Sequence, residues 1–365
     1  MIKPREFIEK IKPYKPGKPI EEVVRELNLK CEVIKLASNE NPLGTSPLAI
    51  KAMRKALRET FLYPDDNCFY LKNVLAQKLN ISPDEIIVGN GSVEIIPLIA
   101  LAYLNPEDSA IVGRGAFIWY KIAVNIAGAQ LIETPMNNYR HDLKAMAKAI
   151  QKNTKLIFMD NPNNPTGTMV TKKELEEFLK EIPDNILVVM DEAYREYIDD
   201  PDYPDSLNIF KRIKNLLILR TFSKIYGLAG IRLGYGIAQK EIITNLMKLR
   251  INFNVNRVSQ AAGIAALDDD EFVKKSKIVN NEGKKFLYDA FKKLGLFYLP
   301  TYANFIFVDF PKDSQIIYEA LLKKGIITRT IKEYGFPNAL RITIGTEKQN
   351  RRLIKALKEV LKGVA

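Results

Sequence analysis

The chain has 365 residues, of which 47% are hydrophobic and 27% are charged, and its formal net charge is +12. This length suffices for one large domain with a full core and a smaller domain beside it. No segment approaches the roughly 18 to 20 apolar residues that a membrane span needs, and lysines and arginines are mixed with glutamates over many helices instead of forming a basic arm. We therefore expect a soluble, cytoplasmic protein that binds neither membranes nor nucleic acid.

Histidine and cysteine usage narrows the chemistry further. The chain has a single histidine, His141, and two cysteines, Cys31 and Cys68. Two distant thiols make neither a disulfide framework nor a metal cluster, and one histidine excludes a multi-histidine metal site. His141 stands where a polar turn runs into an amphipathic helix, so we expect it at a helix start. An enzyme of this composition takes its acid or base from Lys, Tyr, Asp or Glu, or from a cofactor.

The first two thirds of the chain alternate helical patterns with short apolar runs. Residues 46–60 read as a helix that opens with a serine cap and a proline. The apolar runs read as strands over residues 85–90, 109–113, 129–135, 154–162, 185–193, 215–222 and 231–238. Such an alternation predicts an α/β fold, with a mostly parallel sheet covered by helices on both faces. Only a short turn separates the last two runs, so this pair is expected to break the alternation.

The pattern changes after about residue 255. A long helical region leads into a strand, a helix, two short strands ("GIITRT" and "ALRITIG") and a final helix whose first residues, "TEKQ", form a capping box. These elements predict a smaller α+β domain. We expect a proline-rich N-terminal arm (1–44) that packs with the small domain, a large domain (45–255) and the small domain (256–365).

Polar residues stand where the predicted strands end, and ligands bind at that edge of parallel sheets. They are Gly91-Ser92, Asp160, Asp191 with Tyr194, and Lys224 in "TFSK". A lone amine without histidine suggests Schiff-base catalysis. Pyridoxal phosphate needs a lysine for its aldehyde, a carboxylate at its pyridinium nitrogen and a site for its phosphate. Lys224, Asp191 and the helix start at Gly91-Ser92 suit those roles, and Arg232 can add a charged bond to the phosphate.

Taken in order, the motifs of this chain resemble those of the histidinol-phosphate aminotransferase family, which consists of fold-type I pyridoxal-phosphate transferases. The motifs are "LASNENPLG" (36–44), "YPD" (63–65), "GNGSVEII" (89–96), "AFIWYKIA" (116–123), "YRHDLKAM" (139–146), "NPNNPTGT" (161–168), "MDEAY" (190–194), "TFSKIYGLAGIRLGY" (221–235), "NFNVNRVSQAA" (252–262) and "LRITIGT" (340–346). The resemblance implies a homodimer that binds pyridoxal 5'-phosphate. It also implies the reaction of L-histidinol phosphate and 2-oxoglutarate to imidazole-acetol phosphate and L-glutamate, in histidine biosynthesis.

The resemblance also implies roles for single residues at the reacting end of the cofactor. Lys224 forms the Schiff base with pyridoxal phosphate and later moves the proton between the substrate Cα and the cofactor. Asp191 pairs with the ring nitrogen. Tyr194 and Asn164 bond the ring hydroxyl, and Phe117 stacks on the ring.

Other residues are implied for the two phosphates and for the substrate carboxylate. The cofactor phosphate is held by Ser92, the Val93 amide, Ser223 and Arg232, with Tyr63 from the partner subunit. Arg341 receives the substrate carboxylate, whereas Tyr14 and Arg329 lie where the family contacts the substrate phosphate. The chain departs from the family at Val93, where an aspartate is usual, so only a backbone contact is expected there.

Four other functions are compared with this one. An aromatic amino-acid aminotransferase, acting on phenylalanine and tyrosine, shares every cofactor residue and differs in what Arg329 and Tyr14 meet. A phosphothreonine decarboxylase uses the same scaffold. A pyridoxal-dependent DNA-binding regulator needs a helix-turn-helix domain, for which we expect no room before the large domain. An inactive interaction module is disfavoured because Lys224, Asp191 and Arg341 are all present.

Overall fold

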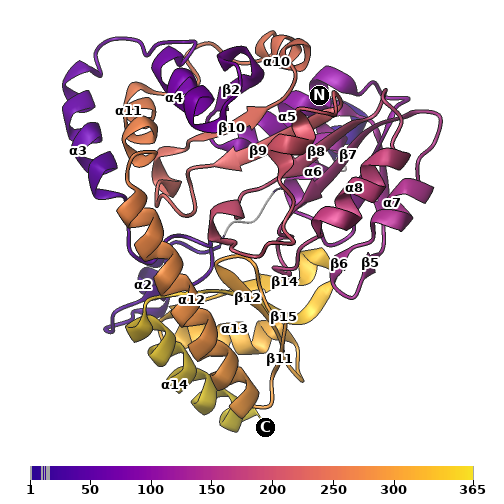
Figure 1. The fold of residues 1–365 in the computed structure, drawn as a ribbon. Coiled ribbons are helices and arrows are strands. Elements are labelled where there is room, and N and C mark those ends of the chain that lie inside the picture. Colours follow the sequence, from indigo (N-terminus) through magenta and orange to yellow (C-terminus); the bar gives the residue numbers. More distant parts are fainter. Residues whose placement is uncertain (1, 10, 12, 14–16, 365) are drawn as a thin grey trace.

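The computed structural model describes residues 2–9, 11, 13 and 17–364. A seven-stranded sheet forms the centre of its larger part (Figure 1). The strands are β2 (Ile86–Gly89), β3 (Ser109–Gly113), β4 (Gln130–Thr134), β7 (Thr154–Asp160), β8 (Leu187–Asp191), β9 (Leu216–Thr221) and β10 (Gly234–Ile237). Their order is β2-β10-β9-β8-β7-β3-β4, and every pair is parallel except the two that involve β10. The predicted α/β fold is confirmed, including the break in alternation at β9 and β10.

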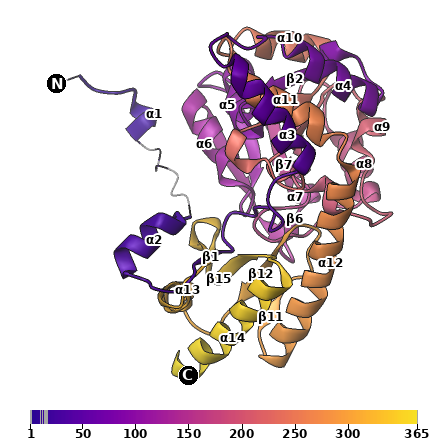
Figure 2. The same cartoon turned by 90° about the vertical axis from the view of Figure 1, so that its left-hand side faces the viewer.

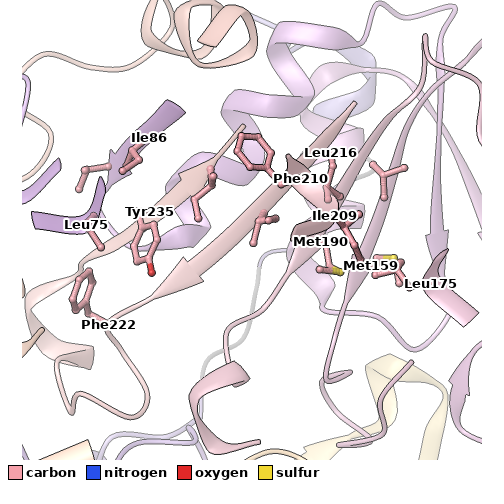
Figure 3. Close-up of a cluster of buried hydrophobic side chains, with 14 of the residues drawn as sticks. Leu75, Ile86, Met159, Leu175, Met190, Ile209, Phe210, Leu216, Phe222 and Tyr235 are labelled. Atoms are coloured by element: carbon pink, nitrogen blue, oxygen red, sulfur yellow. The ribbon is translucent and has the colours of Figure 1, made fainter. Parts of the chain in front are cut away.

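The strands of this sheet are apolar throughout because both of its faces are buried. In β7, Leu156 and Phe158 point to one cluster of buried side chains, and Ile157 and Met159 point to another on the opposite face. Helices α5 (Ser92–Tyr103), α6 (Ile118–Ala127) and α10 (Lys240–Met247) cover the face of Phe158. The other face is covered by α3 (Pro47–Ala56), α4 (Phe69–Leu79), α7 (Leu143–Lys148), α8 (Lys172–Glu181), α9 (Ser206–Phe210) and α11 (Arg257–Ala266). Figure 3 shows part of this second cluster, including Met159 beside Met190.

Several helices begin at the capping residues that the sequence predicts. The hydroxyl of Ser46 accepts a hydrogen bond from the backbone of Ala49 at the start of α3. Reciprocal capping pairs form between Thr171 and Glu174 and between Thr346 and Gln349. Each cap satisfies backbone donors that have no partner within the helix.

The smaller part of the molecule contains a four-stranded antiparallel sheet of order β11-β12-β15-β14 (Figure 1). Its strands are β11 (Phe297–Tyr298), β12 (Phe305–Asp309), β14 (Arg329–Ile331) and β15 (Phe336–Thr343). Helices α12 (Asp270–Lys293), α13 (Ser314–Lys323) and α14 (Glu347–Val364) accompany it, and α12 runs down from the larger part. Among the residues described, no helix has both the length and the apolar character required to cross a membrane.

The N-terminal segment touches both parts of the molecule. Strand β1 (Ile34–Lys35) pairs in parallel with β13 (Ile326–Ile327). Val23 of helix α2 (Ile20–Leu27) belongs to a small cluster of buried side chains that also contains Ile327 of β13. Figure 2 shows α2 beside the smaller sheet. The short helix α1 (Glu6–Glu9) instead places Phe7 against Gly128 at the end of α6.

Helix α11 packs with the large domain, although it follows the domain boundary expected at residue 255. Ala262 and Ala266 are fully buried in the core beside the seven-stranded sheet. Gly263 lies so close to Leu233 that a side chain there would collide with it. The amphipathic pattern of α11 does not distinguish which sheet it covers. We therefore propose that the large domain continues through α11 and that the small domain begins within α12.

Candidate active site

A cavity of about 250 Å³ lies at the carboxyl edge of the seven-stranded sheet. Its lining comes from the strand ends, the start of α5 and the N-terminal segment: Ser38, Glu40, Ser92, Val93, Phe117, Tyr120, Asp160, Pro162, Asn164, Asp191, Ala193, Tyr194, Thr221, Ser223, Lys224, Ala229 and Arg232. All the residues predicted to hold a cofactor line this cavity except Tyr63. The exposed Tyr63 ring instead stacks on Phe253, with 4.7 Å between ring centroids.

Lys224 lies in the turn that follows β9, and its amine is partly buried. Nζ donates a hydrogen bond to the carbonyl oxygen of Ser38 over 3.2 Å. Burial, and next the positive charge of Arg341, lowers the pKa of the Lys224 amine to about 8. A larger fraction of this amine is therefore uncharged near neutral pH than of an ordinary lysine, which suits attack on an aldehyde.

Asp191 ends β8 and is only 4% exposed. One carboxylate oxygen accepts a hydrogen bond from the Tyr120 hydroxyl at 3.0 Å, and the other accepts one from the Ala193 amide at 3.1 Å. Burial, and next the carboxylate of Asp160, raises the pKa of Asp191 to about 7. A cation bound at this carboxylate would offset the free-energy cost of its buried negative charge. A protonated pyridine nitrogen is such a cation, so Asp191 fits the role implied by the resemblance.

The start of α5 forms an anion site with the arginine of the glycine-rich turn. Gly91 has φ +82°, a conformation that favours glycine, and it is the N-cap residue of α5, which begins at Ser92. A Cβ on Gly91 would collide with the Arg232 guanidinium. Arg232, itself at φ +57°, donates to the Ser223 hydroxyl over 3.3 Å. Helix amides, two hydroxyls and a guanidinium converge here, and this set suits a phosphate.

Two polar side chains meet at the hydroxyl of Tyr194. It accepts hydrogen bonds from the amide nitrogens of Asn39 at 2.8 Å and Asn164 at 3.4 Å. Burial raises the pKa of Tyr194 to about 12, so the residue remains an uncharged phenol at neutral pH. Phe117 lines the cavity just before α6, with its ring 5.7 Å from that of Tyr120.

The two arginines of the small sheet are direct neighbours. Arg329 on β14 and Arg341 on β15 are partners in the antiparallel register, so their side chains leave the same face of the sheet. Arg341 donates to the side-chain oxygen of Asn164 and to the carbonyl of Ala37, both at 2.6 Å. Its buried Nε has no hydrogen-bond partner among the residues described. Arg329 forms an ion pair with Glu333. Tyr14 lies outside the described residues.

His141 does not have the role at the helix start that its position in the sequence suggested. Asp142 caps α7 instead, accepting the backbone N–H of Ala145 at 2.9 Å. His141 ends the hairpin of β5 (Met136–Asn137) and β6 (Arg140–His141). Its ring is buried, with Nε2 2.7 Å from a carboxylate oxygen of Asp160. The expected role of His141 at the helix start was wrong. The sequence pattern of a helix does not show which of two adjacent polar residues, His141 or Asp142, caps the helix and which one is buried.

Comparisons with known proteins agree with this geometry. A family model described as aminotransferase class I and II matches residues 31–357. The chain is 52% identical to a histidinol-phosphate aminotransferase of Moorella thermoacetica, covering 98% of this chain and 92% of that protein. It is 50% identical to one from Caldicellulosiruptor saccharolyticus, covering 98% and 99% of the two chains.

A solved structure extends this similarity to the fold. Histidinol-phosphate aminotransferase of Sinorhizobium meliloti in complex with pyridoxal-5'-phosphate superposes with a TM-score of 0.91 at 27% identity, covering 99% of this chain and 98% of that one. Family model, sequence relatives and fold therefore point to one conclusion. The chain belongs to the class I and II aminotransferases and, among them, to the histidinol-phosphate aminotransferase family.

Proposed function

We propose that the protein is a pyridoxal-phosphate-dependent transaminase. In this proposal it converts L-histidinol phosphate and 2-oxoglutarate to imidazole-acetol phosphate and L-glutamate, and the reverse, in histidine biosynthesis. The observation that carries the proposal is the convergence in one cavity of the Lys224 amine, the Asp191 carboxylate and the anion site at α5. The relatives named for the same activity support it.

The bound cofactor withdraws electrons from the substrate Cα and carries the amino group from one substrate to the other. Lys224 anchors the cofactor through its amine, whose lowered pKa of about 8 leaves part of it uncharged. Once released, the same amine moves a proton at the substrate Cα. Asp191 holds the proton on the ring nitrogen, and Tyr194 with Asn164 holds the ring hydroxyl.

The remaining cavity residues position the cofactor in this proposal. Ser92, the Val93 amide, Ser223 and Arg232 bind its phosphate at the start of α5. Val93 contributes only its backbone there, so the absence of an aspartate side chain leaves the anion site intact. The Phe117 ring covers one face of the pyridine and excludes water from it.

The arginine pair accounts for the two kinds of substrate. Glutamate presents carboxylates, whereas histidinol phosphate presents a phosphate and no carboxylate. A guanidinium binds both groups through paired donors. Arg341 has an unpartnered Nε within the described part of the chain and receives the carboxylate. Arg329 receives the phosphate, exchanging its contact with Glu333, and Tyr14 assists it.

A homodimer is part of the same proposal. Large apolar side chains are exposed on the segment between α3 and α4 and on the nearby turn before α11, among them Phe61 (82%), Tyr63 (79%) and Ile251 (75%). A cluster of this kind marks a protein interface. From it, Tyr63 would reach the cofactor phosphate of the partner subunit. We place the enzyme in the cytoplasm, where glutamate and 2-oxoglutarate are available.

A substrate panel tests the proposal. The purified enzyme, loaded with pyridoxal phosphate, is assayed with 2-oxoglutarate and either L-histidinol phosphate, phenylalanine or tyrosine as amino donor. We expect kcat/KM for histidinol phosphate to exceed the other two by about a hundredfold or more, because only this donor offers a dianion to Arg329. Equal values for phenylalanine would instead favour the aromatic aminotransferase.

A further inference from the structure

A buried aspartate in the wall of the cofactor cavity, Asp160, contacts a buried histidine, His141, and neither residue has a part in the mechanism above. Asp160 ends β7 directly beside Asp191, its partner in the parallel register of β7 and β8. His141 contacts Asp160 and also lines a second cavity, of about 250 Å³, at α7 and α8. The pair therefore separates the active site from an outer pocket.

Three hydrogen-bonding groups meet the Asp160 carboxylate. One oxygen lies 2.7 Å from His141 Nε2 and accepts from the Asn163 side chain at 3.1 Å. The other accepts the backbone N–H of Asn164 at 2.8 Å. The carboxylate is only 4% exposed, so these contacts hold it in a fixed position inside the protein.

The hydrogen bonds of the His141 ring indicate which of its nitrogens carries the proton. Its Nδ1 is buried without a hydrogen-bond partner in the described part of the chain. A protonated ring would leave a charged N–H unsatisfied there, which is costlier than an unpartnered acceptor. We therefore assign a neutral imidazole that donates its Nε2 proton to Asp160. The Asn163 side-chain amide lies 3.4 Å from the same Nε2, and it donates to Asp160 over the shorter distance of 3.1 Å. The net charge of the pair is then one negative charge, held rigidly next to Asp191.

We infer that His141 and Asp160 form a positioning pair that places a second negative charge beside Asp191 and so strengthens its hold on the protonated ring nitrogen of the cofactor. The inference rests on the proposed cofactor. Through the Asn164 backbone, the same carboxylate also fixes the residue that faces the ring hydroxyl. Neither Asp160 nor His141 needs to touch substrate for this effect.

Other charged and titratable groups face the two carboxylates. They are Tyr120 from α6, Glu192 and Tyr194 after β8, Lys224 after β9 and Arg341 from β15. Tyr120 and Tyr194 stay uncharged because burial raises the pKa of both. Lys224 donates to Ser38, and Arg341 donates to Asn164 and Ala37. Within the described part of the chain, neither cation forms a hydrogen bond or an ion pair with Asp160.

The test compares two cofactors that differ only at the ring nitrogen. Pyridoxal phosphate and its 1-deaza analogue, in which C–H replaces the nitrogen, share the aldehyde, the ring hydroxyl and the phosphate. Their dissociation constants are measured by equilibrium competition on the full-length protein. In Asp160→Asn we expect the preference for pyridoxal phosphate to fall about tenfold, the equivalent of one pKa unit. A purely structural role would weaken both cofactors equally and leave the ratio unchanged.

Two further variants sharpen the result. Asp142→Asn removes a neighbouring carboxylate that only caps α7, so its ratio should match the wild type. His141→Gln keeps a neutral donor to Asp160, and its ratio should stay within about twofold of the wild type. A tenfold fall in His141→Gln would overturn the neutral imidazole. If Asp160→Asn does not fold, Asp160→Ala should show the same fall.

The outcomes separate this inference from the proposed function. If the wild type took up neither cofactor, the proposed function itself would fail. If the wild type binds pyridoxal phosphate and prefers it, but Asp160→Asn and Asp160→Ala keep the full preference, only the pair is refuted.

Discussion

Replacing Asp191 by asparagine should stabilise the cofactor-free protein at alkaline pH while abolishing its activity. The Asp191 pKa is about 7 in the folded chain and about 3.9 in an unfolded one. A carboxyl group whose pKa rises on folding stabilises the fold at low pH, and this contribution is lost as pH rises through the folded pKa. The penalty in the free energy of unfolding grows by about 2.5 kcal/mol between pH 5 and pH 8, from the two pKa values.

The variant lacks this penalty because an amide does not ionise, and its oxygen can still accept from Tyr120 or Ala193. Urea unfolding of both cofactor-free proteins at pH 5 and pH 8 measures the effect. The stability of Asp191→Asn relative to wild type should rise by about 2.5 kcal/mol between the two pH values. Transamination by the loaded variant should fall by orders of magnitude, because the amide does not hold the ring proton by charge. An unchanged stability difference, or near-normal turnover, would refute this reasoning.

Three further variants test the rest of the site. Arg329→Ala should lower kcat/KM for histidinol phosphate about ten- to a hundredfold, through loss of a charge-assisted contact worth roughly 1.5–3 kcal/mol, and leave phenylalanine unaffected; an equal fall for both donors argues against a phosphate contact. Gly91→Ala should raise the dissociation constant for pyridoxal phosphate in a competition assay, because a Cβ there meets Arg232; unchanged affinity would remove the anion site from α5. Phe61→Asp should shift the protein toward monomers in sedimentation velocity and lower activity with it; an unshifted dimer would place the interface elsewhere.

Much of the fold was predictable from local patterns. Buried parallel strands are recognisable in the sequence as apolar runs. The capping pairs at Thr171 and Thr346 are also predictable, because each forms hydrogen bonds within four consecutive residues. Lys224, Asp191 and Ser92 were foreseeable for a topological reason, since strand ends of one parallel sheet meet at one edge.

The contacts that were not predictable join distant segments. Asn39 reaches the Tyr194 hydroxyl from the N-terminal segment, and Tyr120 reaches Asp191 from a helix whose pattern shows only that it is buried. The bond between His141 and Asp160 depends on how a short hairpin folds over the sheet edge. These three contacts depend on how distant segments pack together, and the periodicity of the sequence contains no information about them.

The central claim is that Lys224 holds pyridoxal phosphate in this cavity, and borohydride reduction tests it most directly. The purified protein should be yellow with bound cofactor, and reduction should fix the pyridoxyl group covalently. Peptide mapping by mass spectrometry then identifies the modified lysine. We predict a single pyridoxyl group on Lys224, in the peptide that contains "TFSK". A pyridoxyl group on any other lysine, with Lys224 unmodified, would contradict the account.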